Sequence, residues 1–112
     1  MKKIEAIIRP ERLGPVRKAI EEVGYQGLTI SDVRGHGTQR GITQQFRGTT
    51  YTVDILPKVR LELVVPDASV PKLLKAIVDA ARTNAVGDGK IFVSTIDDAV
   101  RVRTGETGEK AL

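Results

Sequence analysis

The stretch KVRLELVV at residues 58–65 decides the fold of this 112-residue chain. Its apolar side chains take every second position, at 59, 61, 63 and 65, and the positions between them are charged at 58, 60 and 62. A period of two predicts a β-strand with one buried face and one accessible face. This is the clearest strand pattern in the chain, and the other elements are assigned around it.

Helical patterns stand on both sides of this strand. In residues 11–23 the apolar positions recur at intervals of three and four, which predicts a helix with one buried stripe. We expect Gly24 to cap its C-terminus, and Gly14 with Pro15 to move its start towards Pro15. Residues 70–81 repeat the helical spacing, with Ser69 as the expected N-cap.

Three more stretches predict strands, at residues 3–9, 28–35 and 90–96. The run VRVR at 100–103 predicts a brief further strand, followed by a polar tail that we expect to be mobile. The order of elements predicts one α+β domain over residues 1–112, a ferredoxin-like βαββαβ sandwich with a short C-terminal strand. Both helices would cover one sheet face. The other face, with Ile7, Val64 and Phe92, would stay open and favour symmetric packing of subunits.

A long connection, GHGTQRGITQQFRGTTYTVDILP at 35–57, joins the second and third expected strands. It has neither a helical nor a strand period over most of its length and far exceeds the usual four to six residues. We expect a structureless loop that carries function or is disordered.

The composition excludes several kinds of site. The chain has no cysteine and one histidine, His36, which excludes disulfides, thiolate metal sites and a multi-histidine site within one chain. No apolar run is long enough for a signal peptide or a membrane span, so we expect a cytoplasmic protein. The net charge of +4 favours anionic partners, or serves only as a basic solubilising surface.

Two groups of residues are suited to phosphates. The sequence GDGK at 87–90 places glycines, whose backbone amides can approach an anion, directly before a lysine. A plain turn before a strand would have a similar sequence. Arg101 and Arg103 would project from one side of an extended segment and offer forked donors, unless they only solvate a sheet edge.

Four other side chains have open interpretations. Lys58 lies where the long loop closes and would bind a ligand carboxylate; otherwise Lys58, like Glu62 on the same strand, would form an ordinary cross-strand salt bridge. His36 would be a nucleophile or base only with an assigned carboxylate partner. Tyr51 is accessible for modification or folded onto the sheet. Arg47 either enters a partner's groove or is solvated.

Seven blocks of sequence, in order and at matching spacing, carry a resemblance to a known family. They are MKKIEAIIRP, the glycine-rich pattern around 35–41, FRGTTY, LPKVRLELVV, AART, GDGKIFV and VRVRTGE. Over nearly its full length the chain resembles the nitrogen regulatory PII signal-transduction proteins. The resemblance implies a homotrimer without catalytic activity that binds ATP or ADP in clefts between subunits.

The resemblance also assigns residues to this site. A phosphate-binding loop at about 82–90 would face a C-terminal segment, about 100–112, of the neighbouring subunit. The implied nucleotide contacts are Ile7, Thr29, Gly35, Gly37, Thr38, Glu62, Val64, Gly87, Asp88, Gly89, Lys90, Arg101 and Arg103. The implied contacts of the effector 2-oxoglutarate are Gln39, Arg40, Gly41 and Lys58, and Gln39 would also bind Mg²⁺.

The loop at about 36–57 would dock on partner proteins, either an ammonium transporter or a nitrogen-assimilation enzyme. Arg47 would enter the transporter exit, and Tyr51 matches the position that is nucleotidylated in the family. Such docking would recruit the protein to the inner face of the membrane only indirectly, through the transporter.

The sequence departs from the family at Thr38, where an arginine that helps to hold phosphates is usual, and Arg40 is a candidate substitute. Two rival functions remain. A nucleic-acid binder on this fold would stack bases on aromatic side chains of the open face, where the chain offers few, so we expect no nucleic-acid partner. A nucleotide-dependent enzyme would use His36.

Overall fold

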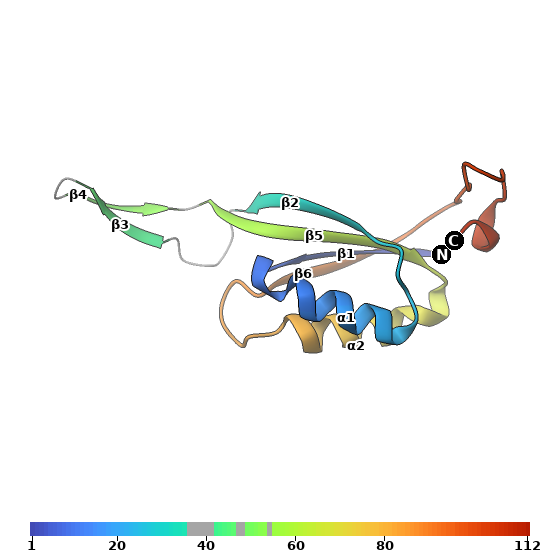
Figure 1. Ribbon diagram of the computed structural model, residues 1–112, viewed down its shortest axis with the longest axis horizontal. Helices are drawn as coiled ribbons and strands as arrows, with labels where there is room; N and C mark the ends of the chain where they lie inside the picture. The colour runs from blue at the N-terminus through green and yellow to red at the C-terminus, as the bar shows by residue number, and fades with distance from the viewer. Residues whose placement is uncertain (36–41, 47–48, 54) are drawn as a thin grey trace.

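A computed structural model of the chain describes residues 1–35, 42–46, 49–53 and 55–112. Its centre is a four-stranded sheet, in which all neighbouring strands are antiparallel, with two helices on one face (Figure 1). The strands lie in the order β2-β5-β1-β6. Their bounds are β1 Lys2–Ile8, β2 Thr29–Gly35, β5 Leu56–Val65 and β6 Gly89–Thr95. This arrangement confirms the predicted ferredoxin-like fold.

The core lies between this sheet and the helices α1, Leu13–Val23, and α2, Val70–Ala81. Along β5 the buried positions alternate with half-buried ones, as the period of two predicted. Full burial of one isoleucine or leucine side chain contributes about 1.5–3 kcal/mol, so this face supplies most of the stability. The largest fully buried side chains are Ile4, Ile8, Ile20, Leu61, Leu73, Ile77, Val16 and Val65.

The helix ends follow the sequence in part. Gly24 adopts a φ of 116°, in the left-handed region, and its N–H caps α1 as expected. The helix begins at Leu13, two residues before Pro15, because a 3₁₀ turn over Pro10–Arg12 leads into it. Ser69 is the N-cap residue of α2, as predicted, but its side chain forms no capping hydrogen bond. Its hydroxyl forms a 2.5 Å hydrogen bond with the hydroxyl of Tyr25 instead.

The segment between β2 and β5 was expected to be structureless, and this was wrong for ten of its residues. β3, Ile42–Phe46, and β4, Thr49–Val53, pair as an antiparallel two-stranded sheet that extends past the end of the main sheet (Figure 1). The two strands are rich in threonine and glutamine. Pattern analysis missed them because it detects strands by an alternation of apolar and polar side chains.

The strand predicted over residues 100–103 was also wrong. Val100 makes one isolated bridge to Thr107, and residues 102–104 form a turn. Val100 is 61% exposed and Val102 is 100% exposed, so neither holds a strand against the sheet. The tail folds back on itself instead and ends in a 3₁₀ turn over Gly108–Ala111. Gly105 and Gly108 permit this return because both have positive φ.

Candidate functional site

The open face of the sheet gathers six of the residues that the family resemblance assigns to the ligand site. Directly paired residues of antiparallel strands project to the same side. Thr29 pairs with Glu62, and Ile7 pairs with both Arg60 and Lys90. Since the neighbours of Ile7 along β1 are buried under the helices, Ile7 itself lies on the other face. The six assigned residues on this face are Ile7, Thr29, Lys58, Glu62, Val64 and Lys90.

Charges on this face are paired mainly within strands. Glu62 lies directly opposite Glu5, which brings two carboxylates together. Arg60 Nε lies 3.2 Å from Glu62 Oε1, and Lys3 Nζ lies 3.7 Å from Glu5 Oε2. The alternative of a cross-strand salt bridge for Glu62 is therefore replaced by an ion pair along β5.

The loop over residues 82–90 is held in shape by the carboxylate of Asp88. It accepts hydrogen bonds from the Thr83 hydroxyl, from the backbone N–H groups of Thr83 and Asn84 at 2.7 and 2.9 Å, and from Arg9 Nε at 3.0 Å. These donors, the Thr83 hydroxyl first, hold the pKa of Asp88 well below its usual range. Arg9 also donates to the carbonyl of Val86 at 2.8 Å. The loop is therefore fixed to the end of β1.

Two glycines of this loop have positive φ, 97° at Gly87 and 111° at Gly89. A Cβ atom at Gly89 would lie 1.8 Å from the carbonyl oxygen of Ile7, a distance that no side chain tolerates. Glycine is thus required by the close approach of two backbones as well as by φ. Backbone in such a conformation can turn its amides towards an anion.

Lys58, in β5, joins this loop to the main sheet. Its Nζ donates to the carbonyl of Gly87 at 2.7 Å. Burial lowers the pKa of Lys58, and the positive charge of Arg9 lowers it further. The lysine expected to bind a carboxylate therefore lies beside the glycines expected to bind phosphates. Gly35 is close as well, since a Cβ placed there would lie 3.6 Å from Lys58 Cγ.

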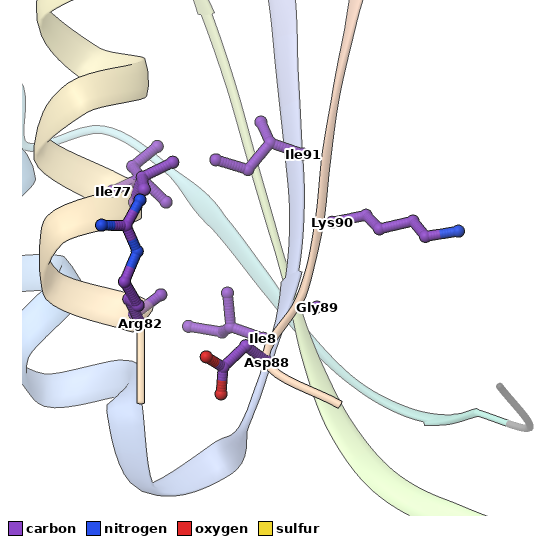
Figure 2. Close-up of a pocket in the computed structure, with 9 residues that line it drawn as sticks. Ile8, Ile77, Arg82, Asp88, Gly89, Lys90 and Ile91 are labelled. Atoms are coloured by element: carbon purple, nitrogen blue, oxygen red, sulfur yellow. The ribbon is translucent and has the colours of Figure 1, made fainter. Parts of the chain in front are cut away.

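A pocket of about 200 Å³ lies on the helix side of the same loop, between α2 and β6. Its lining includes Ile8, Ile77, Ile91, Arg82 and Asp88. Figure 2 shows Ile91 directed to the helix and the Lys90 side chain directed to the opposite face of the sheet. Drug-sized ligands occupy about 300–1,000 Å³. This pocket is smaller than that, and the charged end of Lys90 points away from it.

The two C-terminal arginines lie far from the loop over residues 82–90. β6 leads from that loop to the other end of the sheet, where the C-terminal segment lies (Figure 1). The seven residues of β6 span about 20 Å at about 3.3 Å each. Arg101 donates to Glu106 Oε1 at 3.3 Å and to the backbone oxygen of Leu112 at 3.0 Å, while Arg103 is exposed. The two expected phosphate-binding groups are not brought together within one chain.

Other expected site residues lie outside the described residues: His36, Gly37, Thr38, Gln39, Arg40, Gly41 and Arg47. The backbone of Tyr51 lies in β4, opposite Gln44. Within the part of the chain that the structure describes, His, Asp and Glu residues form no group of three that is suited to a metal. The described helices include none that is long and apolar enough to cross a bilayer.

Sequence reasoning missed two residues that shape the loop over residues 82–90. Thr83 is near Asp88 in sequence, and a threonine five residues before an aspartate in a glycine-bearing loop is a signal of local side-chain to backbone bonding. Arg9 is 79 residues from Asp88. No local sequence pattern predicts such a contact, because the contact depends on the register between β1 and β6.

The chain is similar in sequence to known proteins over almost its whole length. The family model described as "Nitrogen regulatory protein P-II" matches residues 1–106. The chain is 55% identical over 112 residues to the nitrogen regulatory protein P-II of Rhodobacter capsulatus, with both chains covered completely. It is 52% identical to that of Rhodospirillum rubrum, again with complete coverage of both. It is 51% identical to nitrogen regulatory protein P-II 2 of Methanothermobacter thermautotrophicus, over all of this chain and 97% of the relative.

Proposed function

The chain belongs to the nitrogen regulatory P-II family, and from this premise we propose that it is a non-catalytic sensor of ATP, ADP and 2-oxoglutarate. The ligands would bind in clefts between the subunits of a homotrimer. The observation that carries the proposal is the arrangement of Ile7, Glu62, Lys58 and Lys90 on one open sheet face, next to the glycine loop.

The described residues fit a nucleotide in chemical terms. Ile7 and Val64 offer half-buried apolar surface for a base, and Glu62 and Thr29 offer acceptors and a hydroxyl for polar groups nearby. Gly87, Gly89 and Lys90 offer amides and a cation for phosphates. Asp88 supports these groups indirectly by holding the loop, since internal donors surround its carboxylate.

The clefts would be completed by a second subunit. Lys90 and the pair Arg101 and Arg103 stand at opposite ends of β6 in one chain, so they can contact one polyphosphate only if they come from two copies. The open sheet face gives a second reason for assembly. Phe92 is 53% exposed there, and Ile7 and Val64 lie on the same face.

The acid 2-oxoglutarate would bind beside the phosphates, with a carboxylate on the Lys58 ammonium and with Gln39, Arg40 and Gly41 close to it. Mg²⁺, held also by Gln39, would bridge the acid and the phosphates. Lys58 touches the loop over residues 82–90 through Gly87 and lies two positions after Leu56, where β5 begins. A ligand that engages Lys58 would therefore favour one conformer of the 36–57 segment over others.

The 36–57 segment would deliver the signal to an ammonium transporter or a nitrogen-assimilation enzyme, with recruitment to the membrane through the transporter. The β3–β4 hairpin supports this because it extends beyond the main sheet and is thus sterically free to enter a partner's cavity (Figure 1). Arg47 would be the partner contact, and Tyr51, in β4, would be the modification site.

A nucleic-acid function has less support. On the open face, the aromatic side chain among the described residues is that of Phe92. Tyr25 packs against the core and bonds Ser69, so it does not offer a stacking surface on that face. Proteins that stack bases on a sheet commonly use two or three aromatic side chains.

Isothermal titration calorimetry tests the proposed function. We expect ATP to bind the wild-type protein, and 2-oxoglutarate to bind in the presence of Mg-ATP but not of Mg-ADP. The variant Lys58→Ala should lose the binding of 2-oxoglutarate and keep most of its ATP affinity. Lys72→Ala, an exposed lysine on α2, is the matched control. Equal binding of 2-oxoglutarate without any nucleotide would refute the coupled site.

A further inference from the structure

The C-terminal segment holds one of its arginines and leaves the other unrestrained. The guanidinium of Arg101 donates from Nη1 to Glu106 Oε1 at 3.3 Å and from Nη2 to the backbone oxygen of Leu112 at 3.0 Å. The backbone N–H of Arg101 also donates to the Glu106 carbonyl at 2.9 Å. Arg103 is exposed in the adjoining turn, and no hydrogen bond or ion pair joins its side chain to the described residues.

Glu106 is itself fixed in place. Thr104 Oγ1 donates to Glu106 Oε1 at 2.8 Å, and the Glu106 N–H donates back to Thr104 Oγ1 at 3.2 Å. The Gly105 N–H closes the turn by donating to the Arg101 carbonyl at 2.7 Å. The carboxylate therefore does not swing freely, and its position defines where the Arg101 guanidinium lies.

We propose that Glu106 is a positioning residue that aims Arg101 at the phosphates of a bound nucleotide. This inference rests on the proposed function. An unrestrained arginine side chain loses conformational entropy when it binds an anion. Glu106 orders Arg101 before the ligand binds, so part of this entropy cost no longer opposes binding. A guanidinium has five N–H donors, so the two contacts leave donors for a polyphosphate. The ligand class is a nucleoside triphosphate or diphosphate.

Calorimetry with ATP and with AMP tests the role of Glu106. Glu106→Ala should weaken ATP about 3- to 10-fold, the effect of ordering one arginine side chain. Glu106→Gln should stay within about 2-fold of wild type, because its Oε1 still accepts the hydrogen bond. The AMP affinity should change in neither variant, since AMP lacks the phosphates that Arg101 would reach. Glu109→Ala, an exposed glutamate of the last turn, is the matched control.

Background variants separate positioning from general damage to the segment. In an Arg101→Ala background, Glu106→Ala should have no further effect, whereas in an Arg103→Ala background its full effect should remain. The inference is overturned if Glu106→Ala leaves ATP binding unchanged or tightens it, or if it weakens ATP and AMP equally. If Arg101→Ala weakens ATP but Glu106→Ala does not, this inference alone fails. If the wild type binds no nucleotide, the proposed function fails with it.

Discussion

The two faces of the four-stranded sheet are built from the same strands but differ in what covers them. On the helix face Ile4, Leu61 and their neighbours are fully buried. On the open face Ile7 and Glu62 are half-buried among charged side chains. Because adjacent residues of a strand face opposite sides, stability and ligand binding can be altered separately at neighbouring positions.

The sharpest contrast is between Leu61 and Glu62. Leu61→Ala should lower the free energy of unfolding by about 2–5 kcal/mol, since it empties space in the core. Glu62→Ala should lower ATP affinity and leave the unfolding free energy within about 0.5 kcal/mol of wild type. Urea denaturation at one fixed protein concentration measures the unfolding free energies of both variants. Calorimetry measures their ATP affinities. Equal destabilisation by the two variants would contradict the separation of the faces.

Gly89 belongs both to β6 of the sheet and to the loop over residues 82–90. A substitution there should therefore affect the fold and ATP binding together. Gly89→Ala places a Cβ against the Ile7 carbonyl and strains a residue with φ of 111°. We expect ATP affinity to fall about 10-fold or more, as strain of 1–3 kcal/mol displaces the loop. Gly14→Ala is the control, since a Cβ there meets no atom within 4 Å. Unchanged ATP binding in Gly89→Ala would show that the backbone there is not part of the site.

Asp88 gives a smaller effect that depends on pH. Its pKa in the folded protein lies below the ordinary value of 3.8, so its ionised form stabilises the fold. This contribution is complete above the unfolded pKa and is lost as pH falls towards the folded one. Asp88→Asn should therefore lower the melting temperature at pH 7, and the difference from wild type should shrink below about pH 4.

Thr83 supplies the control for this prediction, because its hydroxyl is the first cause of the lowered pKa of Asp88. Thr83→Ser keeps the hydroxyl and should melt as wild type does, while Thr83→Ala should behave as Asp88→Asn does. A difference between Asp88→Asn and wild type that is independent of pH would mean that the carboxylate charge does not hold the loop.

The main sheet and both helices were predictable because their apolar residues repeat with clear periods. The VRVR run shows the limit of that reasoning, since a four-residue alternation specifies no partner strand. Gly105 and Gly108 fold the chain back before one can form. The β3–β4 hairpin was missed because its strands, which are rich in threonine and glutamine, lack a clear alternation of apolar and polar side chains.

Some of the candidate site was also predictable, and the limits are again physical. Once the register of the strands is known, Ile7, Glu62 and Lys58 can be placed on the same face of the sheet. The register itself cannot be predicted from the sequence of any one strand. The tether from Arg9 to Asp88 joins residues far apart in sequence, and the bond from Lys58 to Gly87 depends on loop conformation. Local patterns carry no signal for such contacts.

In the proposed cleft, one ligand is bound by Lys90 of one subunit and by Arg101 and Arg103 of another. Two defective variants test it, Lys90→Ala and the double variant Arg101→Ala with Arg103→Ala. Each alone should bind ATP poorly. When the two are unfolded and refolded together in equal amounts, about a quarter of the clefts in a cyclic assembly should receive both intact halves by random mixing.

Calorimetry of this mixture, with the separately refolded variants as the control, is the most direct measurement. We predict that ATP binding reappears at about a quarter of the sites, with the affinity of the wild type. A mixture that binds no better than its two components would contradict the account, because it would mean that the two groups do not meet across a subunit boundary.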